Sequence, residues 1–231
     1  MSGSSTWALV PLRQLACGKE RLAGVLTPAA RRALVEAMAE DLVRALLELP
    51  LPSTQIVLVS EDPEVATLAL RLGVALFRPS PAACDPLNAA LAEAATRAAA
   101  SGAGAVLMIH ADLPRASAPA LRRLLAAHAA GQSSLPHATL GSDREGTGTN
   151  CLLLSPPLAI PLLFGPGSRA RHRQACAEAG LSCLELAEPA LAFDIDVPAD
   201  LALLVRPGET QDNALGERSQ AWIHSFGRQA G

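Results

Sequence analysis

Apolar runs typical of strands alternate with helical stretches along most of this chain, and that alternation limits the folds open to it. The strand-like runs cover residues 7–12, 55–60, 74–77, 105–110, 137–140, 150–155, 182–186 and 191–196. Capping residues and periodicity predict helices of roughly 10–20 residues between most of them. The pattern predicts an α/β fold, with a mostly parallel sheet covered by helices on both faces. Only a loop joins the runs at 137–140 and 150–155, which predicts an antiparallel element in a mixed sheet.

Length and composition allow one large domain or two small ones, and the alternation of strands and helices favours one. The chain has 231 residues and half of them are hydrophobic, which is enough to bury a sizeable core. We predict one domain over residues 1–206 and a flexible C-terminal tail over 207–231, where the periodicity is lost. The alternative for the tail is a sticky extension built on Trp222, Ile223 and Phe226.

Charge and cysteine usage exclude several classes of protein. The net charge is −3 and no block of basic residues occurs, which argues against a nucleic-acid partner. No apolar run approaches the roughly 18 residues that a membrane span needs. The five cysteines are scattered without a CxxC motif, and the N-terminus lacks the features of a signal peptide. We therefore expect a cytoplasmic protein with reduced thiols.

Ligands of such sheets bind beyond the carboxyl ends of the strands, so the residues there are the first candidates for a site. Lys19 and Arg21 lie in the loop that follows the first strand, and two neighbouring cations can grip a polyphosphate. The alternative is an ordinary solvated loop. Of the 19 basic residues, 18 are arginines, so Lys19 is the only lysine, which favours a specific role for it.

Acidic residues follow two other strands. Asp112 comes directly after the strand at 105–110, and Asp194 and Asp196 alternate within the expected strand 191–196, so both point to the same side. Together the three carboxylates predict a Mg²⁺ site against a substrate phosphate. The alternatives are a turn or cap at Asp112 and a solvated acidic edge at the pair. We expect Asp200 on a surface helix.

Two glycine-containing loops suggest anion binding. The stretch GSDREGTGTN, residues 141–150, is either a tight turn or a cradle whose N–H groups and Thr149 hydroxyl bind a phosphate or carboxylate. Gly165 and Ser168 lead into the helix 168–179, where Ser168 either caps the helix or helps to hold an anion at its N-terminus. Asn88, at the start of another helix, can bind a base or sugar, or serve in capping and packing.

Six segments in order over about residues 8–205 resemble a known family: VPLRQLACGKERL, PLNAAL, HADLP, DREGTGTNCLLLS, FGPGSRARH and FDIDVPADL. They are similar to those of the CofC/FbiD-type guanylyltransferases of coenzyme F-420 biosynthesis. The resemblance implies a GT-A-like nucleotidyltransferase fold. It also implies transfer of GMP from GTP to 2-phospho-L-lactate, phosphoenolpyruvate or 3-phospho-D-glycerate, with release of pyrophosphate.

The same resemblance assigns roles to the candidate residues. Lys19 and Arg21 match the loop that holds the GTP phosphates, and Asn88 matches a nucleotide-pocket position. The acids Asp112, Asp194 and Asp196 match the metal site, with Mg²⁺ as the implied cofactor, and the acceptor pocket corresponds to Thr149, Gly165 and Ser168. In this mechanism Lys19, Arg21 and Asp112 act in catalysis. Two rival functions are a nucleotidyltransferase for another acceptor, such as a sugar phosphate or molybdopterin, and a non-catalytic nucleotide-binding domain. A homodimer is one of the assemblies that the sequence leaves open.

Overall fold

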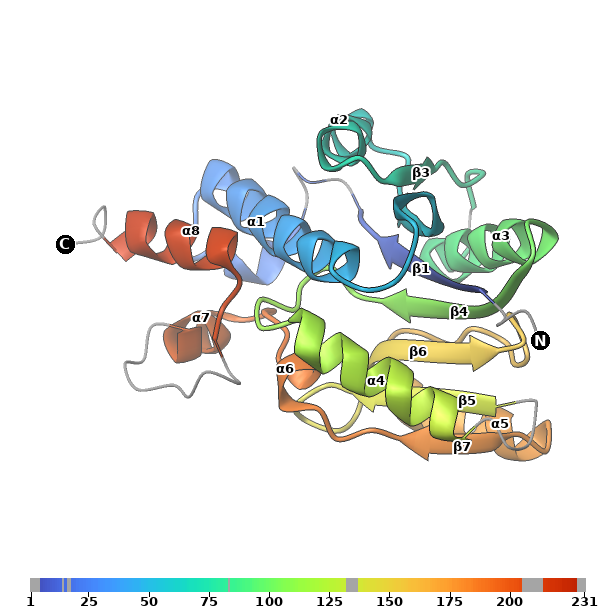
Figure 1. The fold of residues 1–231 in the computed structure, drawn as a ribbon. Coiled ribbons are helices and arrows are strands. Elements are labelled where there is room, and N and C mark those ends of the chain that lie inside the picture. Colours follow the sequence, from blue (N-terminus) through green and yellow to red (C-terminus); the bar gives the residue numbers. More distant parts are fainter. Residues whose placement is uncertain are drawn as a thin grey trace.

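The computed structural model describes residues 5–13, 15, 18–82, 84–131, 137–204 and 214–227. Within these ranges the fold is a mixed sheet between two layers of helices (Figure 1). None of the helices described is both long and apolar enough to cross a membrane.

One seven-stranded sheet, in the order β3-β2-β1-β4-β6-β5-β7, forms the centre of the described structure. Its strands are β1 (Ser5–Pro11), β2 (Ile56–Val59), β3 (Ala75–Phe77), β4 (Ala103–Ile109), β5 (His137–Ser142), β6 (Thr149–Ser155) and β7 (Ser182–Glu185). Strand β6 runs antiparallel to its neighbours β4 and β5, whereas the other neighbouring pairs are parallel. The predicted α/β class and the antiparallel element between residues 137 and 155 are both confirmed.

Helices cover the two faces of the sheet because side chains alternate along each buried strand. On β4, Leu107 belongs to a core with α1 (Pro28–Leu47), α2 (Pro63–Leu72) and α4 (Ala118–Gly131). Its neighbour Met108 points the other way, into a core with α3 (Pro86–Ala100) and α5 (Ser168–Glu178). The remaining helical elements are η2 (Glu20–Leu22), η3 (Ser53–Gln55), α6 (Pro189–Ala192), α7 (Pro198–Leu204) and α8 (Glu217–Gly227).

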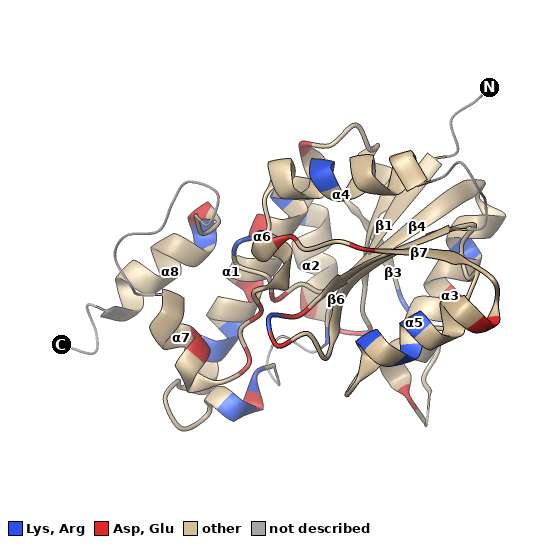
Figure 2. Ribbon diagram, turned by 90° about the horizontal axis from the view of Figure 1, so that it is seen from below, with Lys and Arg blue, Asp and Glu red and all other residues tan. Residues whose placement is uncertain are grey.

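The topology brings two of the candidate loops together. From the carboxyl end of β1 the chain passes through α1 to β2 on one side, while β4 lies on the other side of β1. The loops after β1 and β4 therefore meet at the position where the strand order reverses, which is where open α/β sheets bind ligands. The sheet strands are largely uncharged, and the basic and acidic segments lie mostly on the surrounding helices and loops (Figure 2).

The prediction of a strand at 191–196 is wrong. Pro189 opens the single-turn helix α6, and residues 193–197 continue as a loop. This loop keeps a strand-like alternation, since Phe193 and Ile195 are buried while Asp194 and Asp196 are partly exposed. Phe193 and Ile195 join a third hydrophobic cluster with residues of α1, α7 and α8 rather than an eighth strand of the sheet.

The C-terminal segment differs from the expected flexible tail over residues 217–227, which form helix α8. The carboxylate of Asp41, on α1, accepts hydrogen bonds from the backbone N–H groups of Arg218 (2.9 Å) and Ser219 (2.7 Å), near the start of α8. Ile223 is buried against the third cluster, and the stacked rings of Trp222 and Phe226 pack beside it. The sticky-extension alternative matches this contact. Residues 207–213 and 228–231 of the predicted tail lie outside the described residues.

Candidate active site

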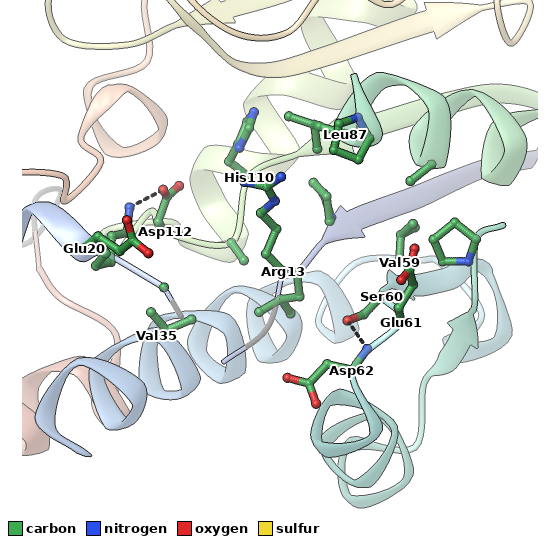
Figure 3. A pocket seen from close by; sticks show the side chains of 18 of the residues that line it. Arg13, Glu20, Val35, Val59, Ser60, Glu61, Asp62, Leu87, His110 and Asp112 are labelled. Atoms are coloured by element: carbon green, nitrogen blue, oxygen red, sulfur yellow. Dashed lines mark hydrogen bonds and ion pairs between the residues drawn. The ribbon is translucent and has the colours of Figure 1, made fainter. Parts of the chain in front are cut away.

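A cleft of about 830 Å³ lies at the point where the strand order reverses. Four of the predicted site residues line it: Lys19, Arg21, Asp112 and Asp196. His110 contributes to the same wall, and Arg13 extends across the cleft toward it (Figure 3). The volume is in the range of small-molecule sites, which run from roughly 300 to 1,000 Å³.

Lys19 connects two of the predicted metal-binding acids. Its Nζ lies 2.5 Å from an oxygen of Asp112 and 2.7 Å from an oxygen of Asp196, and its side chain is only 10% exposed. The residue adopts a left-handed conformation, φ 57°, immediately before η2, which is uncommon for a residue other than glycine. Burial by itself would lower the pKa of Lys19, but the charges and hydrogen bonds of the two carboxylates outweigh the effect of burial. The pKa of Lys19 is therefore raised, and the ammonium stays charged.

The loop 193–197 places the three acids together. The N–H of Ile195 donates to the carbonyl of Asp112 at 3.3 Å, so this loop lies alongside the end of β4. Burial would raise the pKa of Asp112, yet the Lys19 ammonium holds it below its usual value. For Asp194, burial and the negative charges of Asp112 and Asp196 raise the pKa to about 6.

The three carboxylates have the right chemistry for a magnesium ion but are not arranged around one. Hard oxygen ligands are what Mg²⁺ prefers, and oxygens of Asp112 and Asp196 already converge on one cation, the Lys19 ammonium. Among the described residues, no group of three or more His, Cys, Asp or Glu side chains is positioned to hold a metal as it stands. The residues therefore fit a divalent ion provided that Lys19 leaves the position between the two carboxylates.

The loop between β5 and β6 is not the anion cradle that its sequence suggested. Its own Asp143 occupies that place, since the carboxylate accepts hydrogen bonds from the N–H groups of Thr147 (2.7 Å) and Gly148 (2.8 Å). The N–H of Gly146 is also used, by the carbonyl of Asp143 at 3.1 Å. Because these N–H groups are bonded within the loop, the structure favours the tight-turn interpretation over the cradle.

The predicted acceptor pocket centres on the start of α5. Ser168 begins this helix and Gly165 precedes it, but the N–H of Ser168 already donates to the carbonyl of Gly165 and that of Arg169 to Thr147. These two N–H groups are therefore not free for an anion, contrary to the sequence-based expectation. Thr149 remains a candidate, because its hydroxyl lies 3.0 Å from Nδ1 of His172.

His172 fixes the orientation of the Thr149 hydroxyl. Nε2 of His172 accepts a hydrogen bond from the N–H of Leu163 at 2.9 Å, so Nε2 carries no proton. Burial lowers the pKa of His172 to about 4, and the neutral ring therefore carries its proton on Nδ1 and donates it to Thr149. The hydroxyl proton of Thr149 is left to donate elsewhere. His172 itself is fully buried.

The side chain of Asn88 binds backbone groups of the segment at residue 164 and so has a structural role. Its amide oxygen accepts from the N–H of Phe164 at 2.9 Å, and its amide nitrogen donates to the carbonyl of the same residue at 3.1 Å. The nitrogen also contacts the carboxylate of Asp85. Asn88 is buried and does not line the cleft, so it holds the segment at 164 against α3.

One aromatic ring separates the cleft from the predicted acceptor pocket. Phe164 packs edge to face against His110 on the cleft side (5.3 Å between ring centroids) and against His172 on the other side (5.0 Å). Thr149, Gly165 and Ser168 are therefore neighbours of the cleft although none of them lines it as described.

The sequence-based interpretation missed the half of the cleft formed after β2. Ser60, Glu61 and Asp62 line it, opposite the side chains of α3 (Figure 3). One carboxylate oxygen of Asp62 caps α2, and the other accepts from the N–H of Leu15 at 2.9 Å. The position of Ser60, Glu61 and Asp62 directly after a central parallel strand was the signal that could have identified these three residues.

Solved structures of low sequence identity share this fold. A structure from Desulfovibrio desulfuricans G20, described as a nucleotide-diphospho-sugar transferase, has a TM-score of 0.73 at 15% identity and covers 96% of this chain and 98% of its own. A cytidylyltransferase from Leptospira borgpetersenii has a TM-score of 0.58 at 13% identity, covering 98% and 95%. The nucleotidyltransferase fold expected from the sequence is confirmed.

Sequence comparisons give the family. The model described as "Guanylyl transferase CofC like" matches residues 6–216. The phosphoenolpyruvate guanylyltransferase of Rubrobacter xylanophilus is 40% identical over 207 residues, 90% of this chain and 97% of its own length. That of Sphaerobacter thermophilus is 40% identical over 200 residues, 85% and 91% of the two chains. The chain belongs to the CofC-like guanylyl transferase family.

Proposed function

We propose that this protein is a guanylyltransferase that transfers GMP from GTP to the phosphate of a small phosphorylated acid in deazaflavin coenzyme biosynthesis, with release of pyrophosphate. The observation that carries the proposal is the convergence of Lys19, Asp112 and Asp196 in a cleft at the topological switch point of the sheet. Relatives named phosphoenolpyruvate guanylyltransferases favour phosphoenolpyruvate over 2-phospho-L-lactate and 3-phospho-D-glycerate as the acceptor.

Cationic side chains of the cleft bind the triphosphate in this proposal. Arg13 and Arg21 line the cleft together with Lys19 and, unlike it, are exposed. Guanidinium groups pair with phosphate oxygens through two hydrogen bonds, whereas an ammonium acts as a point charge. The departing pyrophosphate gains negative charge, and these three cations stabilise it.

Asp112, Asp194 and Asp196 would hold the magnesium ion. Bound there, Mg²⁺ would neutralise charge on the reacting phosphate groups. Because Asp112 and Asp196 bond Lys19 in the free protein, the same carboxylates would serve the ammonium there and the metal once it is bound. Lys19 would then be released to pair with the phosphates.

The acceptor lies beside Thr149 in the proposal. Its phosphate oxygen is an anion at neutral pH, so the attack on the α-phosphorus needs no general base, and catalysis consists of positioning and charge stabilisation. The hydroxyl of Thr149, oriented by His172, donates to an acceptor oxygen. The rings of Phe164 and His110 separate this position from the cleft, so a shift of Phe164 joins the two.

Pyrophosphate release tests the proposal directly. The purified protein, with GTP and MgCl₂, is assayed against each of the three acids and against no acceptor, and the guanylylated product is identified by mass spectrometry. We expect acceptor-dependent turnover, fastest with phosphoenolpyruvate. Release of no pyrophosphate with any of the three acids would contradict the function, and equal turnover with ATP or CTP would contradict the assignment of guanine.

A further inference from the structure

Asp200 holds the backbone of the loop that carries two of the acids. One of its carboxylate oxygens accepts hydrogen bonds from the N–H groups of Asp196 and Val197, both at 2.8 Å. The side chain is 5% exposed, so these bonds are shielded from water. Asp200 was expected to lie on a surface helix, but it is buried beside the site.

Arg144 reaches Asp200 from the loop between β5 and β6, 56 residues away in the sequence. Its Nη2 donates to the second carboxylate oxygen of Asp200 at 2.8 Å. The guanidinium also lies over the ring of Phe193, 5.1 Å from its centroid, directly before Asp194. Arg144 therefore contacts both ends of the segment 193–200.

The loop that supplies Arg144 is itself fixed at both sides. The carboxylate of Asp143 binds its inner N–H groups, as described above. On the other side, Arg169 donates from its backbone N–H to the carbonyl of Thr147 (3.2 Å) and from its side chain to the carbonyl of Gly146 (3.0 Å). A loop held in this way can serve as a rigid support between the start of α5 and the acids.

We propose that Arg144 is a positioning residue for the metal site: through its ion pair with Asp200 it sets the place of Asp194 and Asp196. The inference rests on the proposed function only for the role of those acids in binding a metal. Residues that orient metal ligands from behind contribute to affinity, and their loss typically costs about 10- to 100-fold in metal binding or activity.

A simpler explanation of Asp200 is a capping interaction at the start of α7. An acid in the first turn of a helix can reach back to the N–H before the helix, as Asp200 does to Val197. A cap of this kind needs no arginine partner. Changing Arg144 while keeping Asp200 therefore separates the two explanations.

The experiment compares Arg144→Met, Arg144→Lys and a control, Arg122→Met, with the unchanged protein. The Arg144 side chain is 38% exposed, and methionine keeps much of its stem, so we expect the variant to fold. Arg122 forms an exposed ion pair with Glu48 at the carboxyl end of α1 and does not line the cleft, so it controls for the loss of one surface arginine.

The first measurement is amide hydrogen exchange at Asp196 and Val197, which requires no activity. Arg144→Met should speed exchange there, Arg144→Lys less so, and Arg122→Met not at all. The second is the free Mg²⁺ concentration that gives half-maximal turnover, which should rise about 10-fold in Arg144→Met while the KM for GTP at saturating Mg²⁺ stays unchanged.

Unchanged exchange at the two amides, or an unchanged Mg²⁺ requirement in an active Arg144→Met protein, would overturn the inference. A protein without guanylyl transfer would refute the proposed function instead. In that event the exchange measurement would still decide whether Arg144 orders the loop.

Discussion

At the scale of single residues, the proposed function gives Lys19 two sets of partners that cannot be bound at once. In the described protein its ammonium bonds Asp112 and Asp196, at the position where a metal would join them. Gripping a triphosphate requires the same ammonium to leave. Without Lys19 the carboxylates of Asp112 and Asp196 would repel one another. Burial and, after it, the negative charges of these two acids already raise the pKa of Asp194.

Replacing Lys19 by methionine should therefore slow GTP-dependent pyrophosphate release by about 100-fold or more, the scale of one lost preorganised charge. Asp112→Asn should have a comparable effect. The steady-state rate with phosphoenolpyruvate is the measurement, and Arg122→Met is the matched control. Near-normal turnover in either site variant would remove that residue from the mechanism.

Thr149 offers a test of the acceptor site alone. Thr149→Val removes the hydroxyl that His172 orients, so the KM for the phosphorylated acid should rise about 10- to 100-fold, as expected for one hydrogen bond to a charged group. The KM for GTP should not change. Thr149→Ser retains the hydroxyl and should remain close to the unchanged protein. An equal rise in both KM values would mean a general disturbance of the fold.

At the scale of elements, α4 and the pair β5 and β6 share a buried polar contact that makes the packing sensitive to acid. His128 of α4 bonds the hydroxyl of Thr139 on β5 (2.9 Å) and that of Ser155 on β6 (2.8 Å). Burial, helped by the neighbouring His137, lowers the pKa of His128 from 6.5 to about 4. The folded protein thus keeps this ring neutral at a pH at which the unfolded chain protonates it.

The sign of the pH effect follows. The stabilisation is complete above pH 6.5 and is lost as the pH falls toward 4, because the unfolded state then binds a proton that the folded state does not. Between pH 7 and pH 4.5 this residue should cost roughly 2–3 kcal/mol of unfolding free energy. Urea unfolding at the two pH values measures it, and His128→Gln should reduce the difference whatever its own stability. The control is His224→Gln, at an exposed histidine, which should leave this difference unchanged. If His128→Gln lost as much unfolding free energy between pH 7 and pH 4.5 as the unchanged protein, His128 would not be the source of the acid sensitivity.

The sequence predicted the elements with strong local signals. Thr27-Pro28 and Asp62-Pro63 cap α1 and α2, and such caps can be predicted because they depend on neighbouring residues only. The loop at 193–197 was assigned as a strand, since its alternation of buried and exposed residues matches one. Whether such a segment joins a sheet depends on contacts with distant helices, here α1, α7 and α8.

The candidate site divides in the same way, into residues with a local sequence signal and contacts between distant residues that have none. Lys19 and Asp112 were predicted to lie at the cleft because strand ends and scarce residue types are visible in the sequence, whereas Asp196 reaches it from a loop that was predicted to be a strand. The sequence did not predict the hydrogen bonds of the Asp143 carboxylate to its own loop. Nor did it predict the ion pair of Arg144 with Asp200. A carboxylate that binds its own loop looks the same in sequence as one that leaves the loop free, and an ion pair across 56 residues has no local pattern.

At the scale of the whole molecule, nucleotide and metal should bind as a linked pair. MgCl₂ alone should barely raise the melting temperature, because Lys19 already neutralises Asp112 and Asp196. GTP with MgCl₂ should raise it by several degrees, since saturation at about 100 times the Kd adds roughly 2.7 kcal/mol. In Lys19→Met the response to MgCl₂ alone should increase. Thermal-shift curves with NaCl at matched ionic strength provide the control, and an equal response of both proteins to MgCl₂ would show that lysine and metal do not compete.

The solitary lysine has a practical consequence. Apart from the chain's amino terminus, Lys19 offers the only primary amine of the sequence to acylating reagents. Its ammonium is enclosed by carboxylates and has a raised pKa, so in the resting protein it should react slowly. Covalent tagging followed by peptide mass mapping would then record, from a single position, each occasion on which the side chain is released.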